Sequence, residues 1–162
     1  MSLMMDIRQR HVALMQKTCK TLGNVLKNVS QEQATTLRDG PNGWTIVEVV
    51  CHLRDFDEFF YGRAVMMREQ NHPDLPGYDH EVLAIEREYN KENLQASYET
   101  LVRSRQRFVE FYHDLTEAEW EREGNHPERN RFTMTDSVMQ VGLHDVTHIE
   151  QITRILNEGV MD

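Results

Sequence analysis

The stretch 138–156 constrains the fold of this chain more than any other, because it predicts both a helix and a buried polar site. Its inward positions recur at alternating steps of three and four residues, which is the spacing of one helical face. The stripe consists of Met134, Val138, Val141, Asp145, His148, Ile152 and Ile155. An acid and an imidazole interrupt the apolar stripe at its centre, and Ile152 resumes it. Such an interruption is typical of a buried polar site, since buried polar groups need partners.

A second histidine lies on the same side of this predicted helix. His144 precedes His148 by four residues, so the two side chains are neighbours across one helical turn. This HxxxH spacing lets two imidazoles bind one metal ion from a single helix. The chain has eight histidines, so the motif alone is weak evidence, and a chance pair remains the alternative.

Length and charge limit the possible classes of protein. A chain of 162 residues favours one domain, 1–162, with a substantial core. The net charge of −9 disfavours a nucleic-acid partner, because phosphate binding needs a basic surface. No apolar run is long enough to span a bilayer, and the first residues show no signal-peptide pattern. Only two cysteines occur, without a CxxC motif, which favours a reduced, cytoplasmic compartment.

Helical periodicity extends over most of the chain. It predicts four long helices, at about 6–28, 45–70, 91–114 and 134–157. The second helix opens with a capping box, in which Thr45 is the N-cap and Glu48 the third helical residue. No segment predicts a strand, so the fold class is all-α, a four-helix bundle. The connection of roughly 18 residues before the last helix exceeds a tight turn and allows a crossover there.

One histidine of the second helix stands close to the apolar face. His52 borders the core stripe and can be either a core histidine or a metal ligand. The HxxxH pair on another inward-facing helix favours the ligand. Glu48 and Asp55 lie at helical spacing from His52 and are predicted to accept hydrogen bonds from its imidazole, as metal-bound histidines require. The alternative is that both acids lie on a solvated helix face.

Two charged residues occupy positions where an apolar residue is expected. Arg105 interrupts the stripe of the third long helix as Asp145 interrupts the last. A buried charge needs a partner, so we predict that Asp145 is at least partly buried and that Arg105 is one donor to it. Rotation of the helices, which would expose both side chains, is the alternative.

The remaining histidines and cysteines carry weaker signals. His126, in the connection before the last helix, is interpreted as an exposed loop residue, with a place at the mouth of the site as the alternative. Cys51 points to a different helical face from His52 and is interpreted as a small core residue. Four further histidines belong to no constellation and are interpreted as surface or boundary residues: His11, His72, His80 and His113.

Two stretches of the chain contain several motif residues each. The first is GWTIVEVVCHLRDFDEFFYGRAVMM, with the pattern W-T-x-x-E-x-x-x-H-L-x-D-x-E. The second is NHPERNRFTMTDSVMQVGLHDVTHIEQITRIL, with H-P-E followed by H-D-x-x-H-x-x-Q-I. Both patterns resemble motifs of the DinB/YfiT-like superfamily of four-helix-bundle, metal-dependent enzymes. The resemblance implies an up-down-down-up bundle, a metal site formed by His52, His144 and His148, and a homodimer. The second family motif often shows a doubled histidine, where this chain has Thr147 before His148.

Three imidazoles favour catalytic metal chemistry. Neutral ligands leave a divalent ion its full charge and at least one open position, at which a bound water or thiol loses its proton near neutral pH. Zinc, nickel and manganese all suit imidazole, so the residues do not distinguish them.

Three functions remain open at this point. The resemblance includes thiol-dependent enzymes, so we favour a metal-dependent S-transferase that joins a low-molecular-weight thiol to small electrophiles. An anionic thiol would enter past basic groups, for which Arg63, Arg105 and Arg131 are candidates, with Arg105 as the predicted cofactor-binding residue. A metal-dependent hydrolase acting on a small-molecule substrate is the first alternative, although no HExxH motif supplies a general base. A non-catalytic metal-binding bundle is the second.

Overall fold

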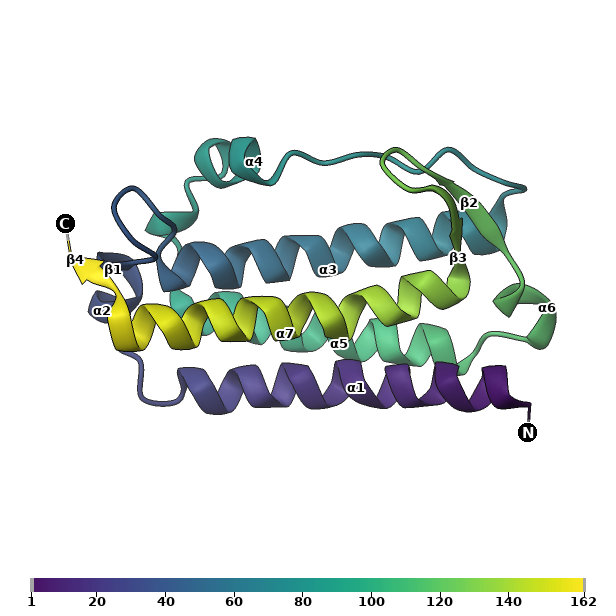
Figure 1. Ribbon diagram of the computed structural model, residues 1–162, viewed down its shortest axis with the longest axis horizontal. Helices are drawn as coiled ribbons and strands as arrows, with labels where there is room; N and C mark the ends of the chain where they lie inside the picture. Colours follow the sequence, from purple (N-terminus) through teal and green to yellow (C-terminus); the bar gives the residue numbers. More distant parts are fainter. Residues whose placement is uncertain (1, 162) are drawn as a thin grey trace.

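Four long helices form the body of the protein in the computed structural model, which describes residues 2–161. They are α1 (Leu3–Leu26), α3 (Ile46–Glu69), α5 (Leu94–His113) and α7 (Met134–Glu158). α1 and α7 run in one direction and α3 and α5 in the other, so the order is up-down-down-up (Figure 1). This confirms the predicted all-α bundle. No helix within residues 2–161 is long and apolar enough to cross a membrane.

The crossover lies between the second and third long helices. Because α3 and α5 are parallel neighbours, the chain must return along the bundle before α5 begins. The crossover segment, residues 70–93, does so over the outer side of α3 and contains α4 (His80–Glu86) and the short 3₁₀-helix η1 (Tyr89–Lys91) (Figure 1). The connection before the last helix, which is long enough to allow a crossover, does not form one.

The connection before α7 folds instead into α6 (Glu117–Trp120) and a β-hairpin. Its strands β2 (Glu123–His126) and β3 (Asn130–Thr133) pair antiparallel, with Gly124 opposite Phe132. The crossover segment joins this hairpin, because the Leu75 N–H donates to the Asn125 carbonyl at 2.9 Å and the Asn125 N–H to the Pro73 carbonyl at 2.8 Å. The absence of strands was predicted wrongly, since short polar strands have no periodicity that sequence analysis detects.

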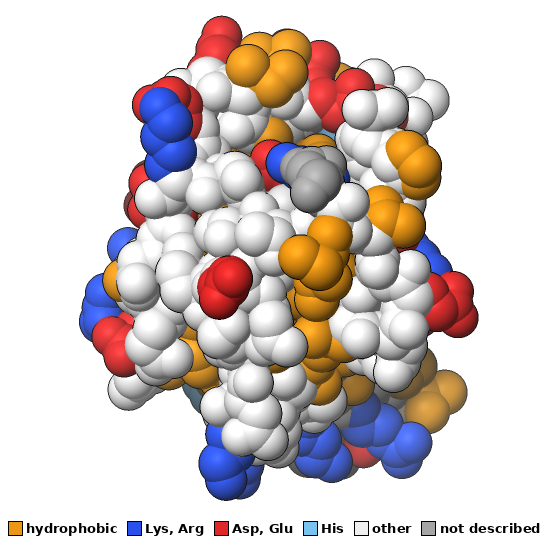
Figure 2. Space-filling model, turned by 90° about the vertical axis from the view of Figure 1, so that its left-hand side faces the viewer, with side chains coloured by type: hydrophobic (Ala, Val, Ile, Leu, Met, Phe, Trp, Pro, Cys, Tyr) orange, Lys and Arg blue, Asp and Glu red, His pale blue; other side chains and the backbone are white. Residues whose placement is uncertain are grey.

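A second strand pair closes the opposite end of the bundle. β1 (Leu37–Arg38) follows the short helix α2 (Gln31–Thr36) and pairs antiparallel with β4 (Val160–Met161). Figure 2 views this end, where most acidic and basic side chains lie around the edge and a strip of apolar side chains runs downward from the centre. The pairing attaches the segment after α7 to the turn before α3.

Side-chain caps fix where the central helices begin. Thr45 accepts a hydrogen bond from the Glu48 N–H, while the Glu48 carboxylate accepts from the Thr45 N–H at 2.7 Å. Thr133 and Asp136 make the same reciprocal pair at the start of α7. Each box satisfies backbone donors that the first helical turn leaves unpaired, and so holds α3 and α7 in the register that their apolar faces require.

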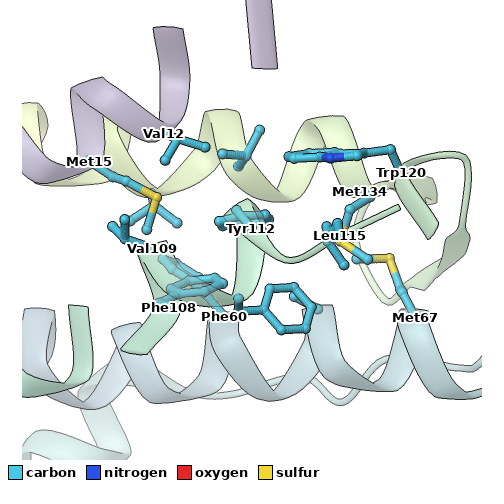
Figure 3. Close-up of a cluster of buried hydrophobic side chains, with 14 of the residues drawn as sticks. Val12, Met15, Phe60, Met67, Phe108, Val109, Tyr112, Leu115, Trp120 and Met134 are labelled. Carbon is cyan, nitrogen blue, oxygen red and sulfur yellow. The ribbon is translucent and has the colours of Figure 1, made fainter. Parts of the chain in front are cut away.

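Two apolar clusters fill the bundle, one toward each end. In the first, the rings of Phe108 and Tyr112 stack at 4.8 Å and those of Tyr112 and Trp120 at 5.5 Å, with Phe60 reaching them from α3 (Figure 3). The second cluster gathers Ile46, Leu53, Leu101 and Ile152, among others. Between the two clusters each long helix carries at least one buried polar residue: Thr18 on α1, Asp57 on α3, Ser104 and Arg105 on α5, and Asp145 on α7.

Arg105 occupies this separating layer and links the four long helices. The side chain is only 3% exposed. Its guanidinium donates to both oxygens of Asp145, at 2.6 and 2.9 Å, and to Asp57 at 2.8 Å. It also donates to the carbonyl of Met15 at 2.7 Å. The predicted burial of Asp145 with Arg105 as its donor is confirmed.

Two hydroxyl groups complete the Arg105 layer. Thr18 of α1 donates to Asp145, and Ser104 of α5 donates to Asp57 at 2.6 Å. Burial raises the pKa of Asp57, whereas its hydrogen bonds and the charge of Arg105 lower it. Two carboxylates thus share one buried cation. The hydroxyl groups donate further hydrogen bonds to carboxylate oxygens, in addition to those from the guanidinium.

Replacement of Arg105 by methionine is expected to destabilise the protein by about 3–5 kcal/mol, because two buried carboxylates would lose their cation. Arg103→Met is the matched control: Arg103 is exposed on the same helix and donates to Thr100 at 3.0 Å. The control should cost about 1 kcal/mol or less. Urea unfolding at pH 7 measures both variants, and equal midpoints would contradict the structural role of the Arg105 layer.

Candidate metal centre

Three histidine rings converge between α3 and α7. His52 projects from α3, while His144 and His148 project from successive turns of α7. The ring centroids are 5.0 Å apart for His52–His144 and 4.6 Å apart for each of the other two pairs. One nitrogen from each ring lies within 4.8 Å of the others. Nitrogen ligands of one tetrahedral ion are roughly 3.3 Å apart, so these rings suit a single divalent metal ion.

His52 is the most deeply buried of the three. It is 4% exposed, and its Nε2 lies 3.0 Å from Nε2 of His144. Its other ring nitrogen, Nδ1, is buried and has no hydrogen-bond partner within residues 2–161. A buried polar atom without a partner is unfavourable for stability alone, which supports a role for this ring beyond packing.

The acids predicted to orient His52 are engaged elsewhere. Glu48 is used by the capping box at Thr45. Asp55 accepts hydrogen bonds from Arg54 at 2.8 Å, from Arg87 at 2.7 Å and from Tyr89 at 2.6 Å. Neither carboxylate contacts the imidazole, so this prediction is wrong. Helical spacing places both acids near His52. However, Glu48 binds the backbone at the start of α3, and Asp55 binds two arginines and a tyrosine, so neither carboxylate is free to accept from the imidazole.

Gln151 orients His148 and was missed by sequence analysis. His148 Nδ1 lies 2.8 Å from Gln151 Oε1, which accepts, so Nδ1 carries the proton and Nε2 presents its lone pair. Gln151 in turn donates to Asp39 at 3.0 Å, and Arg154 donates to both oxygens of that carboxylate. This chain of hydrogen bonds fixes the ring as the outer partners of metal-bound histidines do. The signal available in the sequence was the glutamine of the H-x-x-Q part of the family motif, which Gln151 matches.

The environment keeps all three imidazoles neutral. Burial lowers the pKa of His52 to about 2, and the neighbouring rings add to the effect. Burial also lowers the pKa of His144 to about 3. The pKa of His148 is lowered by burial too, although the bond to Gln151 opposes the shift. Neutral rings are the form that binds a metal, so no proton has to leave them at pH 7.

The cluster opens into a cavity of about 340 Å³. α3 and α7 form its floor, because the lining residues of each recur at steps of three or four along one helical face. The roof consists of part of the crossover segment and of the hairpin turn, which both lie over α3 in Figure 1. The lining residues are His52, Phe56, Phe60, Arg63, Gly77, Tyr78, His80, His126, Pro127, Glu128, Arg129, Gln140, His144 and His148.

The basic residues predicted to admit an anionic cosubstrate differ in their positions. Arg105 belongs to the buried layer and does not line this cavity, so its predicted cofactor-binding role here is wrong. Arg131 is exposed, pairs with Glu123 at 2.6 Å and lies outside the lining. Arg63 is buried and lines the cavity. A stripe position identifies a buried charge but not which cavity it faces.

Two histidines interpreted as surface residues also line the cavity. His126 is 7% exposed, because strand β2 turns it under the hairpin. His80 is exposed but stands at the rim, with its ring centroid 5.9 Å from that of His52 and 5.7 Å from that of Trp44. The surface interpretation of His126 is therefore wrong, since the hairpin that buries it was not predicted. Cys51 is buried in the core, as predicted.

Sequence comparison agrees with the fold and the histidine cluster. The chain matches the DinB superfamily over residues 14–152, which include all three histidines. The chain belongs to the DinB superfamily. Two relatives from Oceanobacillus iheyensis, each named "putative metal-dependent hydrolase", share 26% identity over 137 residues and 24% over 139 residues. These alignments cover 84% and 85% of this chain and 78% and 79% of the relatives.

Two solved structures show the same fold. YfiT from Bacillus subtilis, described as "a probable metal-dependent hydrolase with an unusual four-helix bundle topology", superimposes with a TM-score of 0.84 at 22% identity. The superposition covers 93% of this chain and 86% of YfiT. A mycothiol-dependent maleylpyruvate isomerase superimposes with a TM-score of 0.72 at 14% identity, over 96% of this chain and 70% of the isomerase. At these identities the likeness concerns the fold alone.

One equivalent of zinc is expected to bind the wild-type protein, and the His52→Ala variant should fail to retain it, because two imidazoles remain. Gln151→Leu is expected to weaken binding about 10–100-fold, since His148 would lose its orienting acceptor. Asn157→Ala, an exposed change on the same helix, serves as the control. Competition with a chromophoric chelator and elemental analysis measure the affinity and the stoichiometry. Retention of one equivalent by each of the three His→Ala variants would exclude this site.

The metal-free protein is expected to lose stability as the pH falls from 7.5 to 5. The unfolded chain protonates His52 near pH 6.5, whereas the folded protein, in which its pKa is about 2, does not. The unfolded state therefore binds more protons, and His52 alone lowers the free energy of unfolding by about 2 kcal/mol at pH 5. Urea unfolding in EDTA across this range measures the loss. His52→Gln should flatten the profile and the exposed His113→Gln should not; identical profiles would refute the assignment.

Proposed function

We propose that this protein is a divalent-metal-dependent hydrolase of small molecules. The observation that carries the proposal is the convergence of three neutral imidazoles, His52, His144 and His148, at one end of the cavity floor. Two curated relatives named as metal-dependent hydrolases support the same reaction class.

The donor set fits a catalytic ion better than a structural one. Structural zinc sites have four protein ligands, whereas three nitrogen donors leave a position open toward the cavity. A divalent cation held there would supply Lewis-acid chemistry, polarising a substrate carbonyl and making water a better nucleophile near neutral pH. Zinc, nickel and manganese are all compatible with imidazole.

The other lining residues can bind substrate, exclude water and move protons. Phe56 and Phe60 give the floor an apolar surface on which a small organic group can pack. Tyr78 stacks on Phe59 at a centroid distance of 3.8 Å and covers the cavity from the crossover segment. His80 and Glu128 line the cavity outside the cluster and can accept a proton from water or pass one to a leaving group.

A thiol-dependent transferase is the second candidate. The mycothiol-dependent isomerase with the same fold supports it. Cys19 and Cys51 are both buried, and burial raises the pKa of each thiol to about 11. Neither can serve as a thiolate nucleophile at neutral pH. Transfer would therefore need a low-molecular-weight thiol as a cosubstrate.

Metal-loaded protein tested on esters and amides should distinguish the two candidates. Separate samples carry zinc, nickel or manganese and are assayed with and without glutathione, bacillithiol or mycothiol. The expected result is metal-dependent hydrolysis without thiol that falls by roughly 100-fold or more in His148→Ala and is unchanged in Asn157→Ala. Turnover only with a thiol would favour the transferase. Stoichiometric metal without any turnover would instead indicate a non-catalytic metal-binding bundle.

A further inference from the structure

Arg63 lies at the opposite end of the cavity floor from the histidine cluster. It follows His52 by eleven residues on α3, which is about three turns, or roughly 16 Å along the helix axis. Eleven residues return nearly to the same helical face, so both side chains belong to one floor. Arg63 is 5% exposed and lines the cavity.

The hydrogen-bond partners of this buried cation are neutral. Arg63 donates through Nε and Nη2 to the carbonyl of Pro76, at 3.0 and 2.6 Å. Its Nη1 lies 3.1 Å from Nε2 of His126. Burial, followed by the charge of Arg63, lowers the pKa of His126, so this ring stays neutral at pH 7. The contacts position Arg63 without cancelling its charge.

No carboxylate oxygen within residues 2–161 forms an ion pair with Arg63. The negative charge of Glu128 stabilises the protonated form of Arg63 from a greater distance than an ion pair. The positive charge of Arg129, which also lines the cavity, destabilises that form. The ring of Tyr78 covers the guanidinium at 5.3 Å. Arg105, the other buried arginine discussed above, differs in this respect because it forms ion pairs with two carboxylates. Burial of an unpaired cation is unfavourable, and it lowers the pKa of Arg63.

The floor between the two ends is apolar. Phe56 and Phe60 occupy the turns of α3 between His52 and Arg63, and both line the cavity. A ligand that spans the floor therefore meets the three neutral imidazoles at one end, aromatic rings in the middle and the guanidinium of Arg63 at the other end.

We propose that Arg63 forms an anion-binding subsite for the carboxylate or phosphate terminus of the substrate. An apolar segment of that substrate packs over Phe56 and Phe60, and the bond to be cleaved lies at the histidine cluster. Guanidinium groups bind both anions through charge-assisted, often bidentate, hydrogen bonds. The reaction in this inference rests on the proposed hydrolase function, whereas the anion binding does not.

Isothermal titration with three matched probes tests the subsite. The probes are 4-phenylbutanoate, 3-phenylpropyl phosphate and the neutral 4-phenylbutanamide. Wild-type protein is expected to bind one or both anions at least about tenfold more tightly than the amide. The better-bound anion identifies the preferred terminus. Equal binding of all three probes would overturn the proposal.

Variants assign the preference to Arg63. Arg63→Gln should abolish the preference for anions, and Arg63→Lys should retain part of it because the charge remains. Arg103→Gln, which removes an exposed charge elsewhere, is the control and should behave as wild type. Thermal unfolding checks that the variants fold, because Arg63 also holds Pro76 and His126. If Arg63→Gln does not fold, Arg63→Lys replaces it and should weaken the preference, because an ammonium cannot form the bidentate contact of a guanidinium. A folded Arg63 variant that keeps the full preference would overturn the proposal.

The titrations are run on metal-chelated and metal-loaded protein, and hydrolysis of matched anionic and neutral esters is assayed separately. An Arg63-dependent preference without any hydrolysis would retain the subsite and reject the hydrolase. Hydrolysis without a preference for anionic esters would retain the hydrolase and reject the subsite. A preference that needs the metal and persists in Arg63→Gln would mean that the anion binds the metal ion, which also rejects the subsite.

Discussion

The buried guanidinium of Arg105 is the contact on which the arrangement of the four helices depends. It joins α5 to Asp57 of α3, to Asp145 of α7 and to a carbonyl of α1 at one level of the bundle. Apolar contacts tolerate small rotations of a helix, whereas a bidentate ion pair does not, because a displaced carboxylate would be buried without a partner. Asp145 stands between His144 and His148 in the sequence, so directing it inward sets the rotation of α7. That rotation presents both imidazoles to His52.

Local periodicity accounts for the features that the sequence predicts well. The long helices, their capping boxes and the HxxxH pair are patterns within single segments, and helical geometry relates such residues directly. The pairing of Arg105 with Asp145 was also predictable, because a charge in an apolar stripe requires a partner. The case for His52 depended on another helix and on the family resemblance, since one histidine beside an apolar face has no local signature.

The features that the sequence did not predict depend on contacts between distant segments. His126 is buried only because a hairpin pairs with the crossover segment, and neither has a periodicity of its own. Asp39 supports Gln151 from a turn more than a hundred residues away. Glu48 and Asp55 failed as partners of His52 for a related reason: spacing identifies which groups are near a ring, but competition among donors decides which bonds form.

The topology separates the groups suited to chemistry from those suited to selecting a ligand. The three histidines project from helices that the Arg105 layer fixes, whereas the roof comes from the crossover segment and the hairpin turn, which lie outside that layer. Backbone hydrogen bonds at Pro73, Leu75 and Asn125 join these two roof segments, and such bonds place little demand on side-chain identity. Substitutions in the roof can therefore reshape the cavity while the bundle and its histidines stay in place, which gives one scaffold a route to many ligands.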